Sequence, residues 1–153
     1  MSEKDPILDR LQALCVKREY CESDIYRKAL ALCKDRPDPE RKAAEMVSSL
    51  VKDRFVDDRR YSGAYAREKS SLSGWGPLKI RTSLLSKKIE PSIVKEALKE
   101  VDQSRAQEKL KAVLARKWKS LQDDPQGKYK LIRFALSRGY EYDVIRPLVE
   151  ETV

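Results

Sequence analysis

Apolar side chains recur every three or four residues along most of this chain, the spacing that gathers them on one side of an α-helix. The first stripe comprises Ile7, Leu8, Leu11, Leu14 and Cys15. Similar stripes follow at residues 25–33, 43–51, 61–65, 80–85, 93–101, 110–118, 129–136 and 144–149. No convincing alternating run exceeds a few residues, and no Asn-Gly or Asp-Gly hairpin turn occurs. The pattern therefore predicts an all-α protein of nine short helices.

Prolines and capping residues divide these stripes from one another. Pro37 and Pro39 interrupt the chain after the second helix, because proline lacks the amide donor and restricts its predecessor. The expected N-terminal caps are Ser23 or Asp24, Asp38, Asp57 or Asp58, and Ser104 with Gln107 as a capping box. Later helices are expected to open at Pro77, Pro91 and Pro125, the eighth to stop at Gly139, and the ninth to kink at Pro147.

An internal repeat connects the helices. Moving residues 76–98 forward by 51 positions superimposes their apolar sites on the last third and places Gly76 on Gly127 and Lys87 on Arg138. The first third fits more loosely, at offsets of 55 and 47. We therefore expect three tandem three-helix repeats, at residues 1–56, 57–103 and 104–153. Units this small have little core each, so stacking them predicts an elongated, curved array with a long concave face.

Charge is concentrated within the last two of these repeats. The 153 residues include 33 basic and 25 acidic side chains, for a net charge of +8. From Arg59 to Lys88 the sequence has eight basic residues and one acidic residue, Glu68. From Arg105 to Arg138 it has ten basic and three acidic residues. Such a field favours association with a polyanion or an acidic protein surface.

Catalytic motifs are missing from the sequence. Histidine is absent, which excludes Ser-His-Asp and Cys-His nucleophile arrangements, and no Walker, GxGxxG, HExxH or GxSxG motif occurs. The pairs Asp57-Asp58 and Asp123-Asp124 could bind metal ions, but both lie at expected helix starts or loops, where carboxylates cap backbone amides. We expect no enzyme activity, no catalytic residue, no metal and no cofactor.

The cysteines and the absence of long apolar runs indicate the compartment. Cys15, Cys21 and Cys33 are an odd number without a CxxC pair, and the chain shows neither a leader-like N-terminus nor a run of about 18 apolar residues. We therefore expect a soluble cytoplasmic protein with reduced thiols and no membrane partner.

The aromatic residues leave two interpretations open. Trp75, between Gly74 and Gly76 among basic residues, either packs internally or makes an exposed contact of the kind that stacks on nucleic-acid bases. Trp118 and Tyr129 are expected in the core.

Three separated motifs resemble a known family. Residues 54–98, RFVDDRRYSGAYAREKSSLSGWGPLKIRTSLLSKKIEPSIVKEAL, combine an Asp-Asp pair that opens a helix, a Gly-x-Gly-Pro turn and a basic-apolar helix. REYCESDI at 18–25 and LIRFALSRGYEYDVIRPLVEE at 131–151 flank them. In this order the motifs resemble the RecX regulatory proteins over nearly the whole chain. Lys88 departs from the pattern, because the family has glycine there. A residue with a side chain adopts the left-handed backbone conformation at a higher conformational cost than glycine.

This resemblance implies three tandem three-helix repeats and a regulator of the RecA recombinase. Such proteins are understood to lodge in the groove of the RecA filament and to restrain ATP hydrolysis and strand exchange. The side chains expected to contact the partner are Arg67, Lys69, Trp75, Lys79, Arg81, Lys87, Lys88, Arg133 and Arg138. The alternative is a direct binder of single- or double-stranded DNA that places the same side chains on phosphates.

Overall fold

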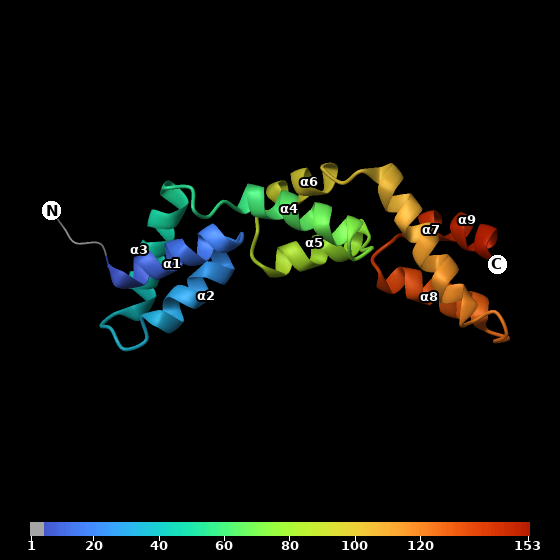
Figure 1. Cartoon of the computed structure of the whole chain (residues 1–153), viewed down its shortest axis with the longest axis horizontal. Helices are drawn as coiled ribbons and strands as arrows, with labels where there is room; N and C mark the ends of the chain where they lie inside the picture. The colour runs from blue at the N-terminus through green and yellow to red at the C-terminus, as the bar shows by residue number, and fades with distance from the viewer. Residues whose placement is uncertain (1–4) are drawn as a thin grey trace. The chain divides into compact units, whose positions relative to one another are not determined.

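Residues 5–153 are described by a computed structural model, in which they form nine α-helices and no strand (Figure 1). The helices are α1 (Pro6–Lys17), α2 (Glu22–Leu32), α3 (Pro39–Lys52), α4 (Asp58–Ser71), α5 (Pro77–Ser86), α6 (Pro91–Lys99), α7 (Gln103–Lys119), α8 (Gly127–Ser137) and α9 (Tyr142–Thr152). The predicted all-α class is thus confirmed, and the element order is that of a helical repeat array. Within residues 5–153, no helix is long and apolar enough to cross a bilayer.

Two compact units make up this part of the chain. The first contains the described residues up to Ser62 together with Lys87–Ile89, and the second contains Gly63–Ser86 and Glu90–Val153. Helix α4 contributes residues to both units, and the segment after α5 returns to the first one. This division into two units does not test the boundaries of the three sequence repeats, which remain a prediction.

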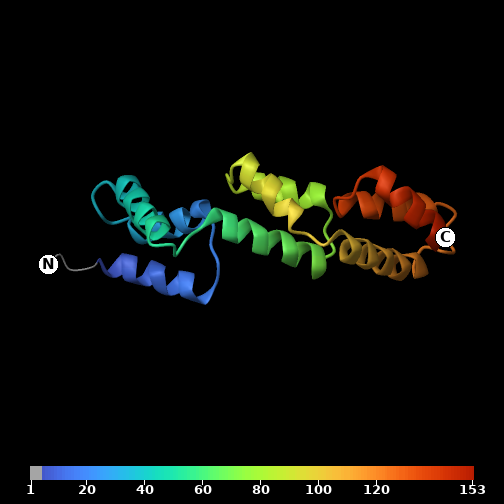
Figure 2. The ribbon, with the colours of Figure 1, turned by 90° about the horizontal axis from the view of Figure 1, so that it is seen from above.

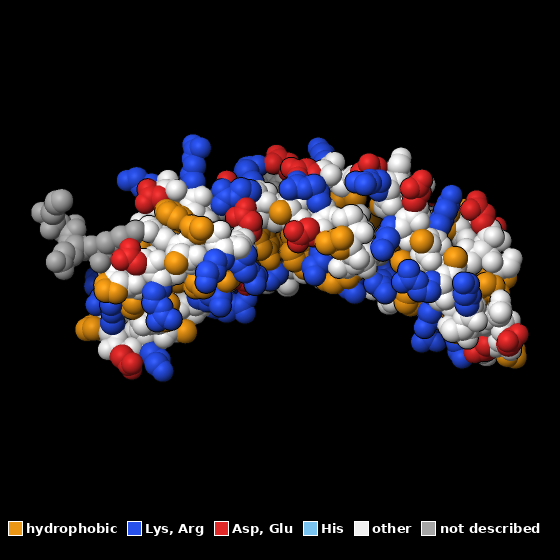
Figure 3. Space-filling view, viewed as in Figure 1, with side chains coloured by type: hydrophobic (Ala, Val, Ile, Leu, Met, Phe, Trp, Pro, Cys, Tyr) orange, Lys and Arg blue, Asp and Glu red, His pale blue; other side chains and the backbone are white. Residues whose placement is uncertain are grey.

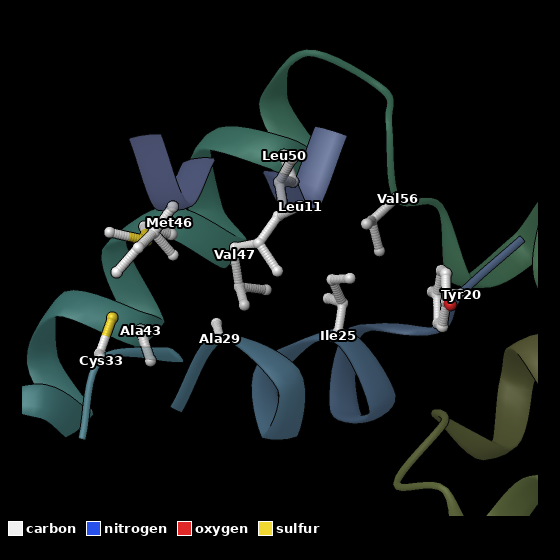
Figure 4. Packing of buried hydrophobic residues seen from close by; sticks show 11 residues of the cluster. Leu11, Tyr20, Ile25, Ala29, Cys33, Ala43, Met46, Val47, Leu50 and Val56 are labelled. Atoms are coloured by element: carbon white, nitrogen blue, oxygen red, sulfur yellow. The ribbon is translucent and has the colours of Figure 1, made fainter. Parts of the chain in front are cut away.

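The core of the first unit is built by the apolar stripes of α1, α2 and α3. Leu11, Ile25 and Leu50, one from each helix, have no exposed surface (Figure 4). Ala29 and Ala43 let α2 and α3 approach closely, because their side chains are short. Truncating Leu50 to Ala would cost about 2–5 kcal/mol, since the surrounding helices cannot fully fill the space.

The second unit repeats the same arrangement of three helices. Figure 1 and Figure 2 both show the α5–α6 pair beside α4. The α8–α9 pair packs against α7. The core between α7, α8 and α9 comprises Leu110, Leu114, Leu131, Ala135, Tyr140, Ile145, Leu148 and Val149.

Equivalent repeat positions have equivalent environments. Ile80 and Leu131, which are 51 residues apart, are both buried, and so are Val94 and Ile145 at the same offset. The rule extends to the surface, because Leu85 and its equivalent Leu136 are both exposed. Residues related by the sequence repeat therefore have similar exposure, both in the core and at the surface.

Three of the expected side-chain caps are not formed. Asp38 occupies the N-cap position of α3, but its side chain pairs with Arg41 and makes no capping hydrogen bond. Helix α2 begins after Cys21, and neither Ser23 nor Asp24 caps it, because Asp24 forms ion pairs with Arg27 and Lys87. Helix α7 begins at Gln103, where Asp102 Oδ1 accepts a hydrogen bond from the backbone N–H of Arg105 over 3.2 Å. An aspartate two residues upstream thus takes the role expected of Ser104.

The expected environment of Tyr129 is also wrong. Its side chain is 72% exposed, because α8 starts at Gly127 and buries Gly127, Leu131 and Ala135 at four-residue intervals. Tyr129 lies midway between two of these positions, and at 100° per residue that places it on the opposite side of the helix. Trp118 does pack against the core of the second unit, and α9 continues through Pro147.

Candidate interaction surface

The turns before α5 and after α8 meet through main-chain atoms. The backbone N–H of Gly76 donates to the carbonyl of Arg138 over 2.6 Å, and that of Leu78 donates to the carbonyl of Gly139 over 3.0 Å. A Cβ added to Gly139 (φ 93°) would lie 2.5 Å from the backbone nitrogen of Lys79, and one added to Gly76 would lie 2.7 Å from that of Tyr140. Glycine at both positions therefore allows this contact, which we call the glycine junction.

Side chains reinforce the glycine junction. A guanidinium nitrogen of Arg138 donates to the carbonyl of Ser73 over 2.8 Å, and the Tyr140 hydroxyl donates to the carbonyl of Trp75 over 3.4 Å. Burial raises the pKa of Tyr140, although the nearby charge of Arg138 opposes the shift, so its hydroxyl stays protonated and able to donate. The junction holds α5 and α8 in a fixed relation within the second unit.

Trp75 lies partly buried beside the junction. Its backbone N–H donates to the carbonyl of Lys69 over 2.9 Å, and its ring meets that of Tyr65 edge-on at 6.3 Å between centroids. The ammonium groups of Lys69 and Lys79 lie 4.8 and 4.4 Å from the centroid of the Trp75 ring. Trp75 therefore packs partly against Tyr65 and already has cations over its aromatic surface.

A shallow groove of about 440 Å³ runs between α5 and the end of α8. The residues that line this α5–α8 groove are Trp75, Leu78, Lys79, Thr82, Ser83, Ser86, Leu136, Ser137 and Gly139. Neither α5 nor α8 contains an acidic residue. Figure 3 shows lysine and arginine side chains interspersed with apolar atoms over this part of the second unit. The groove thus combines positive charge with apolar surface.

Other predicted contact residues lie on the surface with their charges available. Arg81 on α5, Lys88 after it and Arg133 on α8 are exposed and form no ion pair within residues 5–153. Arg67 on α4 is half-exposed and pairs with Glu100, which partly neutralises it. Lys88 has φ 62°, the left-handed backbone conformation that the resemblance implied for this position.

Lys87 has an internal role in the first unit. Its ammonium group donates to Asp24 Oδ2 over 3.1 Å, and its carbonyl accepts a hydrogen bond from Ser23 Oγ over 2.7 Å. Burial opposes the charge on both partners, but the hydrogen bond and attraction between them prevail, so the pKa of Asp24 is lowered and that of Lys87 is raised. Lys87 therefore holds residues 87–89 against α2, with its side chain only 25% exposed.

Carboxylates of both pairs bind backbone amides. Asp57 Oδ1 accepts from the backbone N–H groups of Arg59 and Arg60 over 2.9 and 3.1 Å, and Asp58 Oδ1 accepts from that of Glu22 over 2.8 Å. Asp124 accepts from the backbone of Gln126 and pairs with Lys130. The structure confirms the capping interpretation for Asp57 and Asp58, whereas Asp124 binds the amide of Gln126, the residue before α8, and leaves that helix without a side-chain cap. In the described part of the chain, no three His, Cys, Asp or Glu residues gather as a metal ion would require.

Sequence reasoning missed the glycine junction and the groove beside it. Gly74, Gly76 and Gly139 each signalled a turn, but nothing in a single sequence pairs turns that lie more than 60 residues apart. Leu136 was assigned to a helix by its spacing and Leu78 lies just after Pro77, the expected helix start, whereas their exposure depends on how α5 and α8 are joined.

Comparison with known families and proteins adds a separate line of evidence. Residues 57–98 match the model described as "RecX, second three-helix domain", and residues 104–149 match "RecX, third three-helix domain". The "Regulatory protein RecX" of Bacillus mycoides (strain KBAB4) is 34% identical over 110 residues, and that of Bacillus thuringiensis (strain Al Hakam) is 33% identical over the same length. These matches cover 71% of this chain but only 41% of each relative.

Two solved structures share the fold. "Crystal structure of regulatory protein RecX" superimposes with a TM-score of 0.81 at 21% identity, covering 94% of this chain and 70% of the other. "Crystal structure of RecX from Lactobacillus salivarius" superimposes with a TM-score of 0.74 at 19% identity, covering 95% of this chain and 96% of the other.

Proposed function

Because this chain belongs to the RecX family, we propose that it regulates the RecA recombinase by binding the RecA filament and restraining ATP hydrolysis and strand exchange. The observation that carries the proposal is the absence of acidic residues from α5 and α8, the helices that bear Lys79, Arg81 and Arg133. The proposed partner places the protein in the cytoplasm and requires no catalytic residue.

The proposed mechanism is occupation of the filament surface. Cations spread over two helices attract an acidic surface at long range and increase the rate of encounter. We further propose that the repeats at residues 1–56, 57–103 and 104–153 act as separate binding modules. Several modest contacts on one chain then raise the overall affinity, because each contact increases the local concentration of the next.

The nine predicted contact residues divide into two groups under this proposal. Lys79, Arg81, Lys88 and Arg133 supply charge to the partner, together with Lys69 and the partly neutralised Arg67. Lys87 and Arg138 chiefly hold local structure through Asp24 and the Ser73 carbonyl, and Trp75 supports the groove. Variants for a binding test should therefore spare these last three.

The test is a titration of RecA ATPase activity on single-stranded DNA. Changing Lys79, Arg81, Lys88 and Arg133 together to Ala should raise the half-inhibitory concentration by about tenfold or more, while circular dichroism shows unchanged helix content. The double variant Lys99→Ala/Arg146→Ala is the control, because it removes exposed charges from α6 and α9 and should inhibit like the original protein. Absence of inhibition by the original protein would overturn the proposal.

A direct DNA-binding function is the alternative that the same cations support. It is distinguished by comparing binding to bare DNA and to RecA-coated DNA across a range of salt concentrations. A DNA binder would show a steep salt dependence, with each neutralised phosphate adding to the slope. Equal affinity for both substrates would favour this alternative over filament binding.

A further inference from the structure

Two exposed leucines lie in the basic α5–α8 groove. Leu78 on α5 is 41% exposed and Leu136 on α8 is 44% exposed, and both line the groove together with Lys79. We propose that this groove binds an acidic peptide segment of a protein partner, which places an aliphatic side chain against Leu78 and Leu136 and carboxylates near Lys79 and Arg133. The inference rests on the proposed function only for the identity of that partner.

The apolar surface favours a peptide. Burying a leucine side chain completely contributes about 1.5–3 kcal/mol, so two half-exposed leucines offer a useful gain to an aliphatic partner side chain. A sugar-phosphate backbone gains little from such contacts. A base could stack on Trp75 only by displacing a lysine ammonium group from its ring, because Lys69 and Lys79 already lie within 4.8 Å of the ring centroid.

The polar groups of the groove favour carboxylates as the other half of the ligand. The hydroxyls of Ser86 and Ser137 donate to backbone carbonyls of their own helices over 2.6 Å, and that of Ser83 pairs with Tyr65. Among the described residues that line the groove, only Lys79 carries a charge. Arg133 lies three residues before Leu136 and therefore on the same side of α8. Because α5 and α8 contain no acidic residue, their cations are complementary in charge to an acidic segment of a partner.

The groove is held in shape before any ligand arrives. Its two walls are joined at the glycine junction by the hydrogen bonds from Gly76 to Arg138 and from Leu78 to Gly139. A preformed site binds more tightly than a flexible one, because less conformational entropy is lost on binding. A short peptide can therefore bind there measurably on its own.

The experiment uses two labelled synthetic helical peptides of equal negative charge. One carries glutamates with leucines four residues apart, and the other replaces these leucines by serine. The protein should bind the leucine peptide at least about tenfold more tightly in fluorescence anisotropy. Leu78→Ser/Leu136→Ser should abolish this preference, whereas Leu72→Ser, which changes a 75% exposed leucine outside the groove, should preserve it. Equal binding of both peptides by the original protein would overturn the proposal.

Two further measurements separate this inference from the proposed function. Leu78→Ser/Leu136→Ser should weaken binding to RecA-coated DNA while leaving bare single-stranded DNA binding unchanged, and a matching loss on bare DNA would assign the groove to nucleic acid and overturn the inference. If the original protein prefers the leucine peptide but never inhibits RecA, the groove stands and the RecA assignment fails. If it inhibits RecA but shows no peptide preference, the proposed function is supported and the peptide-binding role of the groove is overturned.

Discussion

Asp58 Oδ1 accepts a hydrogen bond from the backbone N–H of Glu22 over 2.8 Å, so a side chain at the start of α4 caps the start of α2. The first-turn amides of α2 have no side-chain cap from their own segment, because Cys21 occupies the N-cap position and its side chain makes no capping hydrogen bond. The cap thus reaches across 36 residues of sequence. Asp57, one residue earlier, caps α4 itself. Two adjacent carboxylates therefore stabilise the starts of two helices in the first unit.

Asp58→Ala should lower the free energy of unfolding by about 1 kcal/mol, the usual cost of losing an N-terminal cap. Asp58→Asn should lose less, because the amide oxygen still accepts a hydrogen bond. Urea unfolding followed by circular dichroism measures the difference. Asp123→Ala is the control, since Asp123 is exposed and should leave stability unchanged. An Asp58→Ala variant as stable as this control would contradict the capping role.

Alanine should be far more costly at Gly139 than at Gly74. Both glycines have positive φ, 93° and 67°, so both substitutions incur a conformational cost of about 1 kcal/mol. At Gly139 the added methyl also meets the Lys79 backbone nitrogen at 2.5 Å, whereas at Gly74 the nearest atom lies 3.5 Å away. Overpacking should bring the loss at Gly139 to about 2–4 kcal/mol. Thermal unfolding of both variants checks the contrast, and equal losses would show that the junction can relax.

The ion pair of Asp24 and Lys87 should make stability depend on pH at both extremes. Burial raises the pKa of Asp24, but the hydrogen bond from Lys87 outweighs it, so the folded-state pKa lies below its usual value. Its contribution is therefore present above the unfolded-state pKa, near 3.9, and is lost as pH falls through the lower folded value. For Lys87 the sign is opposite, because its pKa is raised despite burial. That contribution is present below about pH 10.4 and is lost as pH rises through the higher folded-state pKa.

Asp24→Asn tests the acidic limb. Its deficit in unfolding free energy relative to the original protein should be largest near about pH 6–7. The deficit should shrink as pH falls below about 4 and through the lowered folded-state pKa, because the original carboxyl is then protonated as well. Urea titrations at several pH values measure this difference. A deficit that stays constant down to pH 2 would show that the carboxylate charge contributes nothing.

The three thiols should react at different rates. Cys21 and Cys33 have no exposed surface, whereas Cys15 is partly exposed, and burial raises the pKa of both Cys15 and Cys21. We expect a thiol reagent at pH 8 to modify one cysteine in the native protein and all three in urea. Cys15→Ser should remove the native reaction. Rapid labelling of three thiols without denaturant would contradict this packing.

Helices were predictable from the sequence because local spacing and local breakers determine them. The buried positions of Ile80, Leu131 and Ile145 follow directly from the 3.6-residue period and from the repeat. Caps were less predictable, because several polar residues compete at each start and tertiary contacts decide among them. Ser23 illustrates this, since its hydroxyl donates to the carbonyl of Lys87 rather than capping α2.

The candidate surface was predictable in charge but not in arrangement. The basic stretches led to Lys79, Arg81, Lys88 and Arg133, because a surplus of cations can be counted. Whether a lysine is neutralised depends on contacts between residues distant in the sequence, such as the ion pair between Lys87 and Asp24. The groove depends on the glycine junction, and hydrogen bonds between main-chain atoms leave no side-chain signature beyond the glycines that permit them.

The glycine junction also bears on how such a protein can diverge. Because peptide groups hold α5 and α8 together, most side chains around the contact can be exchanged without altering the spacing of the two helices. The side chains that contact a partner can then change during evolution while the spacing of α5 and α8 stays the same, provided that residues 76 and 139 remain glycine.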